Sequence, residues 1–90
     1  MFWDDVGYVL ASRARKSVIL HLENPKTPTI LAKALNMNLA NVSRTLSQLE
    51  ESGLAACLTP KKRVGRIYSL TKKGSKVLPE VRKMDQSVMK

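Results

Sequence analysis

Residues 27–53, TPTILAKALNMNLANVSRTLSQLEESG, decide the fold, because they predict two helices joined by a tight turn. Thr27 is a natural N-cap, since its hydroxyl can accept a hydrogen bond from a free backbone N–H, and Pro28 suits the first helical position. Asn36 can adopt the left-handed conformation that ends a helix, with Met37 buried in the turn. Helical spacing predicts an inward stripe on this first helix, formed by Ile30, Leu31, Ala34 and Leu35.

The second helix is expected over residues 39–52, with Asn38 as its N-cap and Gly53 as its stop. Its inward positions are Val42, Leu46 and Leu49. The other face carries hydrogen-bonding side chains and no acid, namely Asn38, Asn41, Ser43, Arg44, Ser47 and Gln48. The two acids of the segment, Glu50 and Glu51, fall in the last turn, away from the N-terminal half.

Two short helices with a tight turn, the second presenting an acid-free polar face, form the layout of a helix-turn-helix over residues 28–53. In such a motif, the N-terminal residues of the second helix lie against base edges in the major groove of DNA. Taken alone, the stretch also fits an ordinary amphipathic hairpin with a solvated polar face.

The charge of the chain is concentrated in its last third. The 90 residues are expected to form one domain, 1–90, with a net charge of +9. Residues 1–58 hold six basic and five acidic side chains, a balance of +1, whereas residues 59–90 hold ten and two, a balance of +8. Such a concentration predicts a polyanion-binding surface, and a solvated basic tail is the alternative.

Several functional classes are not expected from this composition. No apolar run approaches the ~18 residues of a membrane span, and the acidic N-terminus does not fit a signal peptide, so we expect a cytoplasmic protein without a membrane partner. Cys57 and His21 are the only residues of their kinds, which predicts no metal site and no cofactor. Cys57 is expected to fill space on a strand. With no nucleophile–base pair, carboxylate pair or phosphate-binding glycine loop, we predict that the chain is not an enzyme.

Before the central stretch, the pattern predicts a helix from Trp3 to Leu10 and a second from Arg13 to Glu23, capped by Ser12. One continuous helix over 4–23 is the alternative. Phe2 and Trp3 are expected either to fold back onto the domain or to contact a partner.

After the central stretch, the apolar period changes from 3.6 to 2, which predicts an antiparallel hairpin over residues 54–70. Leu54, Ala56 and Leu58 are expected to face inward, together with Tyr68 and Leu70 on the returning strand, 66–70. The loop between the strands is basic over residues 60–66, where the cations are Lys61, Lys62, Arg63 and Arg66.

A last helix is expected over residues 72–89, capped by Thr71 and either kinked or split at Pro79. Its apolar face is formed by Val77, Leu78, Val81, Met84 and Val88. This stripe is longer than a 90-residue domain needs for its own core, so the helix is a candidate dimer contact.

The order of the expected helices and strands along the chain resembles that of a winged helix-turn-helix. This is a mainly helical α+β fold with a small antiparallel hairpin, called the wing. Two stretches, TPTILAKALNMNLANVSRTLSQLEESGL (27–54) and GRIYSLTKKG (65–74), look like those of small archaeal and bacterial transcriptional regulators of the MarR/ArsR-like kind. Together they cover about half of the chain. The resemblance implies a sequence-specific, double-stranded DNA-binding transcriptional regulator that acts as a homodimer through its N-terminal or C-terminal helices.

The resemblance also implies roles for individual residues. Asn41, Ser43 and Arg44 match DNA-facing positions of the recognition helix, whereas the wing cations match positions along the backbone or minor groove. The fork of Arg44 can bond guanine, Asn41 and Gln48 can pair with adenine, and serine hydroxyls suit phosphate or bases. The alternatives are an Arg44 bonded to Gln48, a solvated wing, and a winged-helix adaptor that binds RNA or protein.

Overall fold

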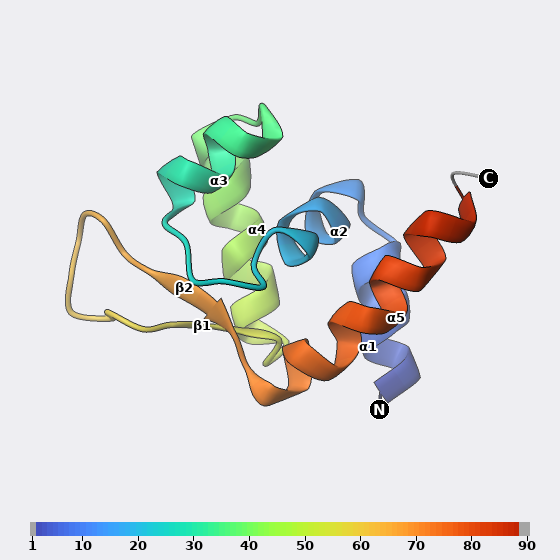
Figure 1. Ribbon diagram of the computed structural model, residues 1–90. Helices are drawn as coiled ribbons and strands as arrows, with labels where there is room; N and C mark the ends of the chain where they lie inside the picture. The colour runs from blue at the N-terminus through green and yellow to red at the C-terminus, as the bar shows by residue number, and fades with distance from the viewer. Residues whose placement is uncertain (1, 89–90) are drawn as a thin grey trace.

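The computed structural model describes residues 2–88 and has the architecture that the sequence predicts, mainly helical with one antiparallel hairpin (Figure 1). Side chains are described as far as residue 85. In chain order the elements are α1 (Phe2–Leu10), α2 (Arg13–Leu20), α3 (Pro28–Leu35), α4 (Leu39–Glu51), β1 (Ala55–Cys57), β2 (Tyr68–Leu70) and α5 (Lys72–Val88).

Local capping chemistry sets the helix boundaries. The Ser12 hydroxyl accepts a hydrogen bond from the Arg15 backbone N–H at 3.2 Å, so the chain breaks between α1 and α2 and one continuous helix over 4–23 is wrong. The hydroxyl of Thr27 caps α3 in the same way, at 3.2 Å from the amide nitrogen of Ile30. Helix α2 ends at Leu20, three residues earlier than expected.

The turn between α3 and α4 is built as the sequence indicates. Asn36 has φ +54°, the left-handed conformation that ends α3, and half-buried Met37 packs against the core. Gly53, with φ +79°, follows the end of α4. The inward stripe of α3 is partly wrong, because Ile30 and Ala34 are exposed while Leu31 is fully buried.

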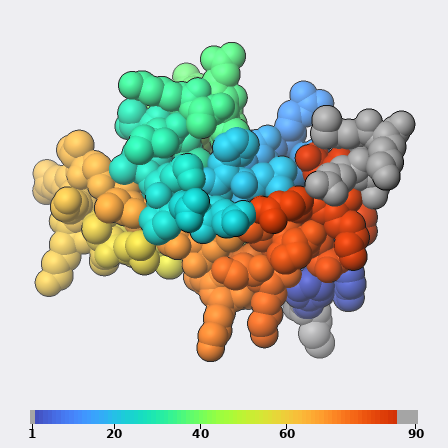
Figure 2. Space-filling model, viewed as in Figure 1, coloured from blue at the N-terminus to red at the C-terminus, as the bar shows by residue number. Residues whose placement is uncertain are grey.

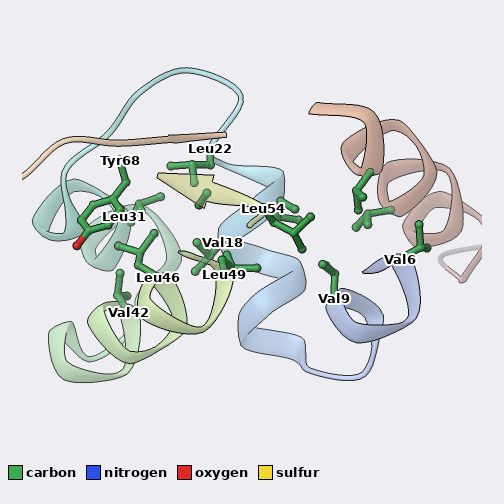
Figure 3. Packing of buried hydrophobic residues seen from close by; sticks show 14 residues of the cluster. Val6, Val9, Val18, Leu22, Leu31, Val42, Leu46, Leu49, Leu54 and Tyr68 are labelled. Atoms are coloured by element: carbon green, nitrogen blue, oxygen red, sulfur yellow. The ribbon is translucent and has the colours of Figure 1, made fainter. Parts of the chain in front are cut away.

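One apolar cluster joins all five helices to the hairpin (Figure 3). Helix α5 belongs to this core, because Val77, Leu78 and Val81 are buried where α5 packs against α1 and α2. We expected this apolar stripe to be available for pairing with a second subunit, and for the residues in the first half of α5 that expectation is wrong. Met84 is 41% exposed, and the side chain of Val88 and residue 89 lie outside the part of the chain that the structure describes.

Helix α5 runs without a break past Pro79, so the helix is not split there. Pro79 is exposed, which places its ring on the solvent side of the helix. Ion pairs join α5 to the rest of the chain at Asp5–Lys73 (3.3 Å), Lys16–Asp85 (3.1 Å) and Glu23–Arg82.

The two strands pair with Ala55 opposite Leu70 and Cys57 opposite Tyr68. The predicted phase of the first strand is wrong, because Ala55 is buried and Leu58 is 56% exposed. The error arises where the chain leaves α4, since Leu54 and Ala55 are buried consecutively before strand alternation begins. Tyr68 and Leu70 do pack on the core as expected, and the returning strand begins at Tyr68.

Candidate nucleic-acid interface

A cleft of about 640 Å³ separates α4 from the wing, residues 54–70. In Figure 1 the wing extends away from the helices on the side where α3 and α4 lie, and Figure 2 shows it as a separate projection. One wall consists of α4, the other of the wing loop, and the start of α3 closes the end. The lining side chains that carry polar groups are Thr27, Thr29, Ser43, Ser47, Arg63, Arg66 and Tyr68.

Most of the predicted polar face of α4 is exposed to solvent. Asn41, Ser43, Arg44 and Ser47 are exposed, because Val42, Thr45, Leu46 and Leu49 occupy the buried side of the same helix. The buried Thr45 hydroxyl donates a hydrogen bond to the Asn41 backbone carbonyl at 2.8 Å, so the helix satisfies this polar group internally.

Asn38 has a structural role at the start of this face. Its carboxamide oxygen accepts a hydrogen bond from the Ala40 amide at 2.7 Å, as expected for an N-cap. The side-chain oxygen is therefore engaged within the helix, and the exposed remainder of Asn38 can donate through its NH₂ group.

Gln48 differs from the other members of the face, because it is half-buried and held by another helix. Its side-chain oxygen accepts a hydrogen bond from an Arg15 guanidinium nitrogen of α2 at 3.4 Å. No bond between Gln48 and Arg44 is found among the described residues. Ser43 and Ser47 line the cleft instead, so α4 presents one flank to the wing and the other to α2.

The wing tip exposes all four predicted cations, Lys61, Lys62, Arg63 and Arg66. Arg66 also shapes the loop, because its Nε donates to the Lys62 carbonyl at 2.7 Å and an Nη donates to the Pro60 carbonyl at 3.1 Å. Val64 is 86% exposed at the tip, beside Gly65 with φ +70°. Arg66 thus keeps the loop folded while its charge stays at the surface.

Sequence reasoning missed two contributors to this region. Arg15 was counted only as one of the basic residues, and its contact with Gln48 joins positions 33 residues apart, which no local pattern reveals. Thr29 lines the cleft because the α3 N-terminus opens into it. The cap signal at Thr27 located that terminus, although it gave no indication of what the terminus faces.

Within residues 2–88, no group of three or more His, Cys, Asp or Glu side chains is placed to hold a metal ion. The helices of that part of the chain are also too short or too polar to cross a bilayer.

Comparison with known proteins places this geometry in a family. The model of the helix-turn-helix domain family matches residues 10–57, more than half of the chain. No curated protein matches the sequence.

Among solved structures, a MarR family transcription regulator has a TM-score of 0.73 and 23% identity, covering 87% of this chain and 54% of its own. The transcriptional regulator BldR from Sulfolobus solfataricus has a TM-score of 0.79 and 23% identity, over 98% of this chain and 66% of its own. The transcriptional repressor CouR, bound to a 23-mer DNA duplex, has a TM-score of 0.72 and 33% identity, over 91% and 60%.

This chain therefore spans between about half and two thirds of the length of these similar structures. The chain belongs to the helix-turn-helix domain family, and its fold is the winged helix of MarR-like transcription regulators.

Proposed function

We propose that this chain binds double-stranded DNA sequence-specifically and regulates transcription, with α4 in the major groove and the wing tip along an adjacent strand. The observation that carries the proposal is that two hydroxyls of the acid-free face of α4, Ser43 and Ser47, line one cleft together with two wing cations, Arg63 and Arg66. A sugar–phosphate strand in that cleft would meet hydroxyl donors on one wall and guanidinium groups on the other.

The charge balance supports this arrangement. Ten of the 16 basic residues lie after position 58, and four of these are at the exposed wing tip. Cations at a phosphate backbone release condensed counterions, which supplies affinity without sequence selectivity. Base reading would come from Arg44 and Asn41, whose exposed side chains offer guanine-type and adenine-type pairing.

The similarity to CouR supports the same proposal. CouR is described as a repressor bound to a DNA duplex, and it is 33% identical over 91% of this chain. We therefore assign duplex DNA, rather than RNA or a protein, as the ligand of this face.

We also propose that two copies of the chain associate through α1 and the end of α5. Trp3 is 61% exposed on α1 and packs edge-to-face against Phe2, with ring centroids 5.0 Å apart. Met84 on α5 is exposed as well. Large apolar side chains that gather on helix surfaces mark interaction sites more often than isolated ones do. A two-fold pair would place two recognition helices on successive turns of the same DNA face.

Selection from a random duplex library tests the DNA proposal. We expect enriched sequences with two related half-sites about 10–10.5 bp apart, or a multiple of that spacing. A gel-shift assay on the selected duplex, with scrambled duplex and RNA as competitors, provides the control. Enrichment of no sequence, or stronger competition by RNA than by scrambled duplex, would contradict the assignment.

Trp3, the only tryptophan, reports on the pairing proposal. Its fluorescence should shift to shorter wavelength as concentration rises, because association removes the indole from water. Trp3→Ala should reduce the molar mass measured by light scattering to that of one chain. A mass of one chain for the unmodified protein at every concentration would rule the pair out.

A further inference from the structure

Arg15 connects three helices at the edge of the recognition face. From α2, its Nε donates to the Tyr8 carbonyl of α1 at 2.8 Å, and its guanidinium carbon lies 3.9 Å from the centre of the Tyr8 ring. A further guanidinium nitrogen donates to the Gln48 side-chain oxygen of α4 at 3.4 Å. The side chain is half-buried, so these contacts restrict it to one orientation.

The chemistry of Arg15 determines which end of the Gln48 amide faces it. Arginine has five N–H donors and no acceptor, so only the oxygen of a glutamine can bond to it. The NH₂ group, on the other arm of the amide, is then the end left for a ligand. A neutral amide elsewhere could rotate to suit either a donor or an acceptor, whereas this one is held.

We propose that Arg15 is a positioning residue that presents Gln48 to DNA as a hydrogen-bond donor. This inference rests on the proposed DNA-binding function and assigns to Gln48, a residue of the same face, a preference for one kind of DNA group. Bidentate pairing with adenine needs the glutamine oxygen and the NH₂ group together. The bond from Arg15 occupies one of the two lone pairs of the Gln48 oxygen and turns that oxygen toward α2. Gln48 therefore favours a ligand that offers only acceptors, either the N7 and O6 edge of guanine or a phosphate oxygen.

The test compares base preferences at every operator position for the wild type and for Arg15→Leu, which keeps the apolar stem and removes the donors. Released from Arg15, Gln48 can use both arms of its amide. We expect the relative affinity for adenine to rise about tenfold at one position, a change within the range of one bidentate contact. The same substitution in a Gln48→Ala background should leave the preference unchanged.

Arg13→Leu is the matched control, because Arg13 lies on the same helix, is exposed and carries the same charge. This variant should lower the affinity for DNA equally for all sequences, or not at all.

Measuring Gln48→Ala shows whether the acceptor that Gln48 meets belongs to a base or to a phosphate. A changed base preference identifies a base edge, whereas a uniform loss that disappears at one methylphosphonate linkage identifies a phosphate.

Gln48→Glu gives a second measurement that does not depend on the folding of the Arg15 variant. A carboxylate accepts from Arg15 with both oxygens and has no donor for DNA, so we expect a melting temperature at or above that of the wild type and weaker DNA binding. The proposal is overturned if Arg15→Leu leaves every base preference unchanged, if its effect persists without Gln48, or if Gln48→Glu melts below the wild type. Failure of the wild type to bind any duplex would instead overturn the proposed function.

Discussion

The carbonyl oxygen of Leu54 lies 2.0 Å from the point where a β-carbon on Gly74 would be placed. The same oxygen accepts a hydrogen bond from the Thr71 amide at 3.1 Å, and the Thr71 hydroxyl donates to the Gly53 carbonyl at 2.6 Å. The first turn of α5 therefore packs directly on the backbone that leaves the recognition helix. Any side chain at position 74 has to push the helix away from this strand.

Gly74→Ala should consequently destabilise the fold. The clash is with backbone, which cannot rotate away, so we expect a loss of roughly 3 kcal/mol in the free energy of unfolding, at the upper end for overpacked sites. Urea denaturation followed by circular dichroism measures it. Gly7→Ala is the control, because nothing lies within 4 Å of its added β-carbon in α1, and it should gain about 0.5–1 kcal/mol. Equal stabilities for the two variants would contradict this packing.

Arg44→Ala should weaken binding to the selected operator more than binding to random duplex. A bidentate contact to guanine contributes about 1–3 kcal/mol of discrimination, whereas the lost charge affects all sequences alike. Arg44→Lys retains the charge without the planar fork, so it should lose discrimination while keeping non-specific affinity. Fluorescence anisotropy on both duplexes measures the difference. Equal losses on the two duplexes would remove the base-reading role of Arg44.

Neutralising Lys61, Lys62 and Arg63 together should flatten the salt dependence of DNA binding. Each lost phosphate contact lowers the slope of log K against log salt by roughly 0.9, so the limit for three contacts is about 2.7. The control is the pair Lys72→Gln and Lys76→Gln, two exposed lysines that border a separate hollow beside Phe2 and Asp5. A slope that changes with the control pair and not with the wing variant would place the DNA elsewhere.

Arg66→Lys should weaken DNA binding at every salt concentration without altering the slope. The substitution keeps the positive charge but removes the two hydrogen bonds that close the loop on the carbonyls of Pro60 and Lys62. Each such bond contributes about 1 kcal/mol to the loop conformation. Titrations of Arg66→Lys and Arg66→Gln over a salt series separate the two effects. Wild-type affinity in Arg66→Lys, with loss only in Arg66→Gln, would mean that the charge alone matters.

The parts of the fold that depend on neighbouring residues could be predicted from the sequence. Ser12, Thr27 and Asn38 bond to amides two or three positions away, and Asn36 and Gly53 relieve backbone strain at their own positions. In each case the residue type that predicts a helix end also makes the hydrogen bond or adopts the backbone conformation that ends the helix. The sequence pattern alone therefore determines where the helix begins or ends.

The parts that depend on distant residues could not be predicted in this way. Ala55 is buried next to Leu54, on whose carbonyl the first turn of α5 packs, whereas Leu58 lies beyond the other end of β1 and is exposed. The contact between Arg15 and Gln48 exists only because α2 packs against α4. For the candidate site, the sequence identified which side chains are exposed on α4, but not which of them another helix already holds.

In the segment before α3, Lys26 and Tyr68 form a two-bond bridge, with N···O distances of 2.8 and 3.0 Å. These two bonds join the entrance of the helix-turn-helix to the base of the wing, whereas the bonds that Arg66 makes in the wing tip, to the carbonyls of Pro60 and Lys62, stay within the loop. A double helix bound between them would therefore meet a wing base at a fixed distance from α3 and a wing tip that the Lys26–Tyr68 bridge does not hold. We expect differences in groove width to be accommodated by the wing tip, while the orientation of α4 relative to the base of the wing stays the same.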